Sequence, residues 1–412
     1  MAARTAVILK RSRYCGIAVL RYCGIKGENM LDEKLLMTPG PTMITTRVLE
    51  IMRRQIIHHR TSNYERSFEE LCENLKLVFQ TKNTVMTFAC SGTGVMEAAV
   101  VNMFSPGDKV LAVSIGAFGD RFASIAKTFG LEVEKYAVEW GKPASADEVK
   151  RILDGDSGQK IKGVLVTHNE TSTGVTNDIK KIADLTKGTE RLLVVDAISS
   201  LGALDLKMDE WGIDVVVTGS QKALMNAPGL GFAALSGKAW AAYSKATLPK
   251  FYWDFGKYRD GIAGASENPP YTPAISLVLA QNEAVKMMLE EGLDNIYARH
   301  KKYALAAQAA VASLGLGLLP DQKDSSYVIT AVRPPEGIDI GGIIKKMNVA
   351  YDVMVVGGQK GLKGKLLRIG HCGYFNRFDM LRTFSALELS LIEAGYALEA
   401  GTSLTVLQKA LM

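Results

Sequence analysis

The chain has 412 residues, 47% hydrophobic and 22% charged, the composition of an ordinary soluble globular protein with room for two buried cores. Its formal charge of +6 lies mostly in residues 1–30, where six Lys or Arg residues face one Glu, so residues 31–412 hold only +1. Because residues 31–412 carry almost no excess of basic residues, nucleic-acid binding is not expected. No apolar run reaches the roughly 18 residues of a membrane span. The five cysteines lack metal-ligand spacing, so we expect no metal site and a reduced, cytoplasmic protein.

Residues 1–30 are rich in Arg and poor in acidic residues, which is typical of an organelle transit peptide. Their apolar stretch GIAVL is interrupted by Arg21 and is too short for a secretory signal. We favour a disordered extension, or a start codon placed upstream of a true start at Met30. A cytoplasmic location is therefore the expectation, with organelle targeting as the alternative.

From residue 84 onward, short strand-like segments alternate with helical ones. Continuous Val, Ile and Leu segments, such as those at 110–113, 192–195 and 215–217, are typical of strands buried on both faces of a parallel sheet. Their alternation with helices predicts a large three-layer α/β domain with a mostly parallel sheet.

After residue 275 the pattern changes to long helical periodicity, followed by short strands within SYVITAV and KLLRIGH and further helices. This order predicts a smaller α+β domain. We expect a large domain at residues 31–290, whose first segment packs on the small domain, and a small C-terminal domain at 291–412.

The segment CSGTGVMEAAVV at 90–101 joins a strand to a helix through a Gly-rich turn. Free backbone amides at such a helix start bind anions, and Ser91 and Thr93 add hydroxyl donors. Glu97 stands where a dinucleotide-binding motif needs its third glycine, which argues against an NAD-binding dehydrogenase. The segment fits one phosphate group, with a plain tight turn as the alternative.

Two further polar or aromatic positions follow strands. Phe118 in SIGAFGDRF could lay its ring over a planar cofactor, or be a core aromatic at a helix start. Thr171 in THNETSTGV is placed to touch a cofactor ring, or to serve turn and capping chemistry.

Asp196 and Lys222 each follow an apolar strand, where open parallel sheets place their ligands. Alone, Asp196 could cap a helix and Lys222 could extend to solvent. Together they are what pyridoxal 5'-phosphate (PLP) requires. The amine forms a Schiff base with the cofactor, aided by a pKa that burial lowers, and the carboxylate keeps the ring nitrogen protonated.

Arg368 lies inside a short apolar strand of the second domain. An arginine in such a place needs an anionic partner. The substrate's α-carboxylate, held by two parallel hydrogen bonds, is one candidate, and an internal salt bridge is the other.

In this order the motifs resemble the class V aminotransferases of PLP fold type I, and within them the alanine/serine–glyoxylate (serine–pyruvate) group. The resemblance runs from residue 37 to about residue 395. It rests on eight segments: TPGPT, SGTG with EAA after it, AFGDRF, ETSTG, VDAISSLG, GSQKAL, YTPAISL and LRIG.

The resemblance implies that Lys222 is the Schiff-base lysine and Asp196 the partner of the ring nitrogen. It assigns Arg368 to the substrate carboxylate and Gly40 to the same pocket. The other cofactor contacts that it implies are Ser91, Gly92, Thr93 and Gln221 near the phosphate and Thr171 near the ring.

It also implies a homodimer with shared active sites, in which Thr272 reaches the phosphate of the neighbouring subunit. Two positions depart from the family pattern. Phe118 stands where animal members have a stacking tryptophan, and the ENPP stretch before Thr272 replaces a tyrosine that would make a second phosphate contact.

The resemblance implies transfer of an amino group from alanine or serine to glyoxylate or pyruvate, in a ping-pong cycle with Lys222 as the proton carrier. One alternative is a class V cysteine desulfurase or related lyase. Those relatives usually place His before the lysine, where this chain has Gln221, and use a mobile Cys, whereas Cys372 is the only late cysteine here. The other alternative is a non-catalytic accessory subunit on the same fold.

Overall fold

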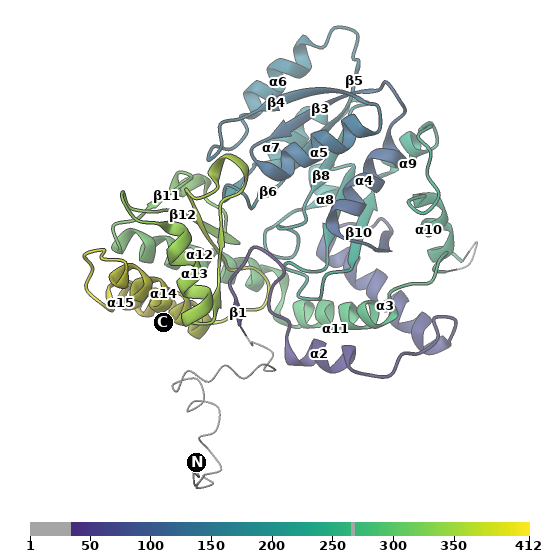
Figure 1. The fold of residues 1–412 in the computed structure, drawn as a ribbon. Coiled ribbons are helices and arrows are strands. Elements are labelled where there is room, and N and C mark those ends of the chain that lie inside the picture. The colour runs from purple at the N-terminus through teal and green to yellow at the C-terminus, as the bar shows by residue number, and fades with distance from the viewer. Residues whose placement is uncertain (1–33, 265–267) are drawn as a thin grey trace, which may run out of the picture. The chain divides into compact units, whose positions relative to one another are not determined.

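The computed structural model describes residues 34–264 and 268–412, and Leu35–Met412 forms one compact unit. The extension expected at residues 1–30 lies outside the described residues. The α/β architecture expected from the sequence is confirmed (Figure 1).

The large sheet has seven strands, and every strand runs in the same direction except β10, which is antiparallel to both neighbours. Its order is β2 (Val85–Ala89), β10 (Leu230–Leu235), β9 (Val215–Gly219), β8 (Leu192–Asp196), β5 (Ile161–Thr167), β3 (Lys109–Ser114) and β4 (Glu132–Ala137). The edge strand β4 was not predicted, because its sequence EVEKYA is half exposed and mostly polar rather than continuously apolar.

Both faces of this sheet are covered by helices, which gives the three expected layers. Alternate residues of one strand belong to different cores: Val164 and Val166 of β5 face one, and Leu165 faces the other. The first core includes α2 (Thr46–Met52), α3 (Ser62–Phe79), α6 (Ala146–Gly155), α7 (Ile179–Thr186), α8 (Met208–Trp211) and α11 (Ile275–Glu291). The second includes α4 (Gly92–Met103), α5 (Ala117–Thr128), α9 (Gly237–Tyr243) and α10 (Phe255–Ile262).

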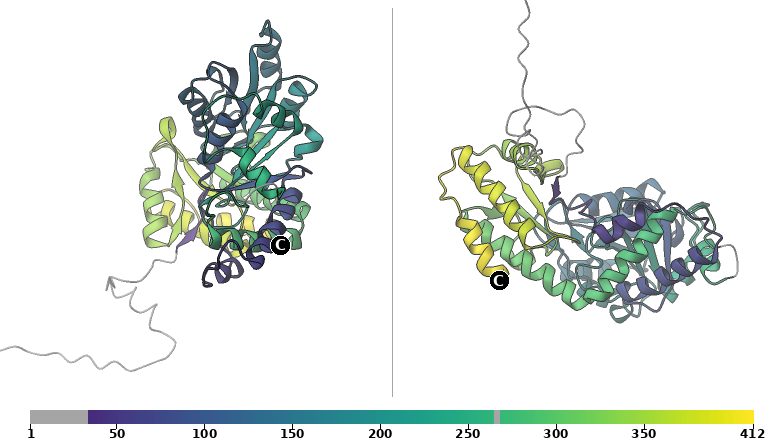
Figure 2. Two further views of the ribbon diagram at one scale, coloured as in Figure 1. Left: turned by 90° about the vertical axis from the view of Figure 1, so that its right-hand side faces the viewer. Right: turned by 90° about the horizontal axis from the view of Figure 1, so that it is seen from below.

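The C-terminal part contains a four-stranded antiparallel sheet with its own hydrophobic core. The strands follow the order β11 (Gly317–Leu318), β12 (Ile329–Arg333), β15 (Leu367–Gly370) and β14 (Val356–Gly357). The helices are α12 (Leu293–Ser313), α13 (Ile340–Ala350), α14 (Arg377–Glu393) and α15 (Thr402–Leu411), with short 3-10 turns at Gln322–Asp324 and Lys360–Leu362. Helix α15 packs against both α12 and α14, and Figure 2 shows the C-terminal helices in yellow.

The N-terminal strand β1 (Leu35–Leu36) pairs in parallel with β13 (Val353–Met354) of the C-terminal part. The long helical region divides into α11 and α12 at Gly292, whose φ of +84° a helix cannot accommodate. The domain boundary proposed at residue 290 falls at this break and stays a prediction, since residues 35–412 cluster as one unit.

Within residues 34–264 and 268–412, no helix is long and apolar enough to cross a membrane. The same residues hold no group of three or more His, Cys, Asp or Glu side chains that could bind a metal ion.

Candidate active site

Three polar side chains stand where neighbouring parallel strands end. Thr167 is the last residue of β5 and lies opposite Asp196, the last residue of β8. Strand β9 pairs with β8, and Lys222 follows shortly after its end. The carboxyl ends of β5, β8 and β9 therefore bring together the carboxylate and the amine that the sequence singled out.

Lys222 is held in a tight corner of the N-terminal segment. Its Nζ donates a hydrogen bond to the carbonyl of Pro39, and a Cβ added at Gly40 would lie 2.4 Å from Nζ. Burial lowers the pKa of Lys222, and the nearby cations of Arg368 and Arg121 lower it further, against the opposing effect of Asp196. An amine with a lowered pKa is a better nucleophile at neutral pH.

Asp196 is buried and interacts electrostatically with this amine. One carboxylate oxygen accepts from the amide of Ile198 (2.9 Å) and the other from the hydroxyl of Thr167 (3.2 Å). Burial raises the pKa of Asp196 to about 6, and the charge of Glu170 adds to this rise. A cation placed against Asp196, such as a protonated ring nitrogen, would stabilise its ionised form.

The start of α4 offers an anion site. Ser91 is the N-cap residue, but its side chain makes no capping hydrogen bond, so the first-turn amides of Gly92 and Thr93 remain available. Gln221 is adjacent: a Cβ on Gly219 would lie 3.1 Å from its Oε1 and 3.6 Å from Gly92. That Oε1 is buried and has no hydrogen-bond partner.

Phe118 lies in the first turn of α5 and is half-buried. The guanidinium of Arg121 stands 4.8 Å from the centre of its ring, and Nη1 of Arg121 donates to Oγ1 of Thr93 at 3.0 Å. Arg121 thus links the candidate stacking ring to the candidate anion site. Sequence reasoning did not select it, although the i,i+3 spacing from Phe118 places both on one helix face.

Arg368 is buried in β15 and reaches the segment that follows β5 in the chain. Its Nη1 donates to the carbonyl of Thr171 at 2.8 Å and its Nε to the carbonyl of Gly357 at 2.9 Å. It forms no ion pair with any residue that the structure describes, so the internal salt bridge considered as an alternative is not formed. Burial lowers the pKa of Arg368 to about 10, whereas the charge of Glu170 raises it.

Thr272 stands apart from these residues. It is exposed just before α11, where it lines a small hollow with Ala89, Leu230 and Tyr252. Among the described residues, no hydrogen bond or ion pair joins Thr272 to Lys222 or Asp196. Its expected reach into a neighbouring subunit stays a prediction.

Comparison with known proteins assigns this arrangement to a family. The sequence model of the family "Aminotransferase class-V" matches residues 35–368. This chain belongs to the class V aminotransferases. The resemblance seen in the sequence is confirmed, and the aminotransferase uses PLP as its cofactor.

Three of the similar proteins carry different names. The chain is 42% identical to the protein named "Soluble hydrogenase, small subunit" of a Synechococcus strain, over 89% of this chain and 95% of that protein. It is 37% identical to serine–glyoxylate aminotransferase of Methylorubrum extorquens, over 89% and 93% respectively. The crystal structure of ureidoglycine–glyoxylate aminotransferase from Bacillus subtilis superposes with a TM-score of 0.88 at 28% identity, over 93% of this chain and 99% of that one.

The residues present in this aminotransferase fit PLP. The free amides at the start of α4 suit an anionic phosphate group, and the site carries an amine and a carboxylate at separate strand ends. The individual roles of these residues are developed below as a proposal.

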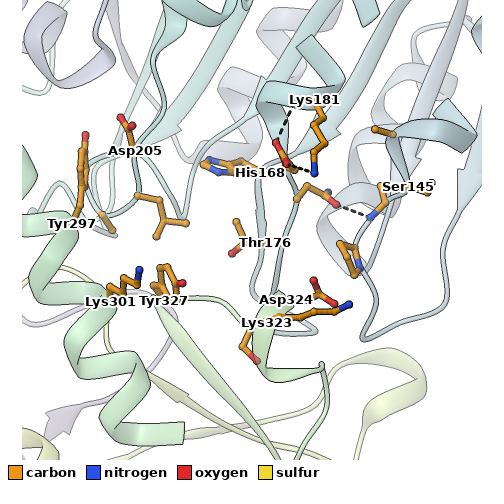
Figure 3. A pocket seen from close by; sticks show the side chains of 18 of the residues that line it. Ser145, His168, Thr176, Lys181, Asp205, Tyr297, Lys301, Lys323, Asp324 and Tyr327 are labelled. Atoms are coloured by element: carbon orange, nitrogen blue, oxygen red, sulfur yellow. Dashed lines mark hydrogen bonds and ion pairs between the residues drawn. The ribbon is translucent and has the colours of Figure 1, made fainter. Parts of the chain in front are cut away.

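A cavity of about 830 Å³ in this aminotransferase contains none of the predicted site residues (Figure 3). Tyr297, Lys301 and Tyr327 line it from one side and His168 from another. Burial lowers the pKa of His168 to about 4, and its Nδ1 has no hydrogen-bond partner. The backbone amide of His168 donates to the carbonyl of Asp196, so a residue that lines this cavity is bonded to the end of strand β8.

Proposed function

We propose that this aminotransferase transfers an amino group from a small amino acid, alanine or serine, to a small 2-oxo acid, glyoxylate or pyruvate. The observation that carries the proposal is the partly buried Lys222 amine, with its lowered pKa, at the end of a strand adjacent to the strand of buried Asp196. The names of glyoxylate aminotransferases among the relatives support the choice of acceptor.

Each proposed cofactor contact follows from its place in the fold. Lys222 binds PLP covalently, and Asp196 takes the ring nitrogen. Ser91, Gly92, Thr93 and Gln221 hold the phosphate at the start of α4. Phe118 lies against the ring, and Thr171 lies beside it. When bound, PLP supplies an electron-withdrawing ring that weakens the Cα–H bond of an attached amino acid.

The chain's own residues do the rest. Arg368 has an unused Nη2, and together with the glycine-lined corner at Gly40 it receives the substrate's α-carboxylate. Once the substrate amine has displaced it, Lys222 Nζ takes the Cα proton of the amino donor. In the second half of the ping-pong cycle the same amine returns a proton to Cα of the new amino acid.

We further propose a cytoplasmic homodimer in which Thr272 of one subunit contacts the phosphate held by the other. Thr272 is exposed, as contact with a second subunit requires. Light scattering of the purified protein tests the dimer, and cell fractionation tests the location. A monomer with full activity would contradict shared sites.

Desulfuration is less supported. Burial raises the pKa of Cys372 to about 12, and the other described cysteines, Cys72 and Cys90, have pKa values raised to about 12 for the same reason. A thiol with such a pKa is a poor nucleophile at neutral pH. The name of the Synechococcus relative suggests an accessory role as a subunit. Such a role would not explain why the chain has both Lys222 and Asp196 at neighbouring strand ends.

A half-reaction screen tests the proposal. Wild-type protein loaded with PLP is mixed with single amino acids, and the absorbance band of the lysine-bound cofactor is followed. Alanine or serine should remove the band and glyoxylate or pyruvate should restore it. Lys222→Ala should show neither the band nor turnover, and borohydride should fix the cofactor to the peptide that contains Lys222. Uptake of PLP without any amino-acid response would favour the accessory role.

A further inference from the structure

Helix α5, which carries Phe118, begins without a cap of its own. Its N-cap residue is Gly116, which has no side chain to accept from the first-turn amides. A Cβ at Gly116 would lie 2.5 Å from Cγ of Glu170 and 2.5 Å from Oγ of Ser172. Glycine is therefore required there, because two side chains from a distant hairpin fill the space that a capping side chain would take.

The side chains of Glu170 and Ser172 accept hydrogen bonds from the free backbone amides at the start of α5. Oε2 of Glu170 accepts from the amides of Phe118 (2.9 Å) and Gly119 (3.1 Å), and Oγ of Ser172 accepts from the amide of Ala117 (2.9 Å). The carboxylate also meets the positive end of the helix dipole. Glu170 belongs to β6 (Asn169–Glu170), whose hairpin with β7 (Val175–Thr176) follows β5.

The hydrogen bonds favour an ionised Glu170. Its other oxygen, Oε1, accepts from the amide of Ser172 (3.0 Å) and from the Ser172 hydroxyl (2.6 Å), so both oxygens face donors. A carboxyl protonated on Oε2 would place its hydrogen against the two amide donors of Phe118 and Gly119. Burial raises the pKa of Glu170, and the four hydrogen bonds oppose that rise.

The carboxylate joins pieces of the site that lie far apart in the chain. Through Phe118 it sets the first turn of α5, and the next residue in its own hairpin, Thr171, accepts a hydrogen bond from Arg368. Glu170 also acts electrostatically on both Asp196 and Arg368. Both of its oxygens are occupied by protein donors, so any effect on a bound cofactor passes through these neighbours.

We propose that Glu170 is a positioning residue for the cofactor ring: it locks the start of α5 to the β6–β7 hairpin and so fixes Phe118 and Thr171 relative to each other. This inference rests on the proposed function, in which both residues contact PLP. Glu170→Gln keeps the size of the side chain but replaces one accepting oxygen with an amino group that confronts amide donors.

The chain contains a matched control. Glu388 is also buried, and from α14 it accepts from the amides of Gly401 and Ser403 and from the Ser403 hydroxyl at the start of α15. Gly401, like Gly116, is an N-cap residue without a capping side chain. Glu388→Gln therefore removes a helix cap of the same kind outside the candidate active site.

The test compares three readouts in the full-length variants: the Kd for PLP, the visible circular dichroism of the bound cofactor, and the melting temperature without PLP. Both substitutions should lower the melting temperature, because each disrupts a buried cap. Only Glu170→Gln should also weaken PLP binding, by roughly tenfold or more, and reduce the circular dichroism of bound PLP. If Glu170→Gln does not fold, Ser172→Ala, which removes the acceptor for Ala117 and keeps the carboxylate, should weaken PLP binding several-fold.

Some results would overturn the inference. A PLP affinity and a dichroism spectrum equal to those of wild type, in Glu170→Gln or in the fallback Ser172→Ala, would reduce Glu170 to a structural cap. Equal losses of PLP binding in Glu170→Gln and Glu388→Gln would do the same. If wild-type protein takes up no PLP, the proposed function itself fails and this inference falls with it.

Discussion

Arg368 of the four-stranded sheet and Thr171 of the β6–β7 hairpin are joined by a hydrogen bond of 2.8 Å from Nη1 to the backbone carbonyl. A second bond, from Nε to Gly357, fixes the guanidinium from its own sheet. Both acceptors are neutral carbonyls, so a buried cation is held in place without being neutralised. Such a cation is suited to an anionic ligand.

Replacing Arg368 with lysine should therefore lower kcat/KM for amino and oxo acids alike, by on the order of a few kcal/mol, and leave the Kd for PLP unchanged. Lysine keeps the charge but loses the planar fork. Steady-state kinetics and PLP titration measure both quantities. Arg333→Lys, on strand β12 of the same sheet, is the control and should behave as wild type. Loss of PLP or of folded protein, with normal kinetics in what survives, would make Arg368 a structural residue.

Asp196→Asn should slow removal of the Cα proton severely while the protein stays folded. A neutral amide cannot hold the cofactor's ring nitrogen in its protonated form. Stopped-flow half-reactions measure the rate. Asp214→Asn is a control at another buried aspartate, one that accepts from Leu193 and pairs with Lys238, and it should cost stability without slowing the half-reaction. Rates within a few-fold of wild type in Asp196→Asn would refute the assignment.

Gly40→Ala should prevent covalent attachment of PLP. The added Cβ would lie 2.4 Å from Lys222 Nζ, and the φ of +133° at Gly40 is unfavourable for any other residue. Gly107→Ala provides the comparison, because its φ of +82° is also positive while its Cβ would meet nothing within 4 Å. We expect both variants to lose stability and only Gly40→Ala to lose the absorbance of the lysine-bound cofactor. Normal absorbance in Gly40→Ala would show that Lys222 can move aside.

The stability of the PLP-free protein should depend on pH through four buried groups. Burial lowers the pKa of His168 and His371 to about 4 and that of His300 to about 3, so each is neutral when folded. The unfolded chain takes up these protons first. The stability that the neutral histidines contribute is complete above about pH 6.5 and is lost as the pH falls toward 4 and below.

Asp196 acts in the opposite direction. Its folded pKa is raised to about 6, so its contribution is complete below about pH 3.8 and is lost as the pH rises through 6. Between pH 4 and 6 Asp196→Asn should therefore make the loss of stability on acidification steeper than in wild type. Urea unfolding of the PLP-free proteins at several pH values measures this. Parallel pH profiles for the two proteins would contradict a raised pKa at Asp196.

Much of the fold could be predicted because strands that are buried on both faces appear in the sequence as continuous apolar segments. Strands β3, β8 and β9 are continuous apolar runs in the sequence, since helices cover both their faces. Strand β4 was not predicted, because it lies at the edge of the sheet and its partly exposed residues are mostly polar. The positions of Asp196 and Lys222 were also predictable, because Asp196 is the last residue of an apolar strand and Lys222 follows shortly after the end of another.

Glu170 and Arg121 could not be found in the same way. The local sequence around Glu170 reads as a polar turn, and nothing in it indicates that the carboxylate caps a helix 52 residues earlier in the chain. The missing cap at Gly116 and the buried charge at Glu170 have separate local explanations, and they become one feature only when β5 and β3 pair in the sheet. Local patterns determine which residues are buried and how the backbone runs. Only the tertiary structure decides which distant donor meets which acceptor, because hydrogen bonds depend on distance in space and carry no signature along the chain.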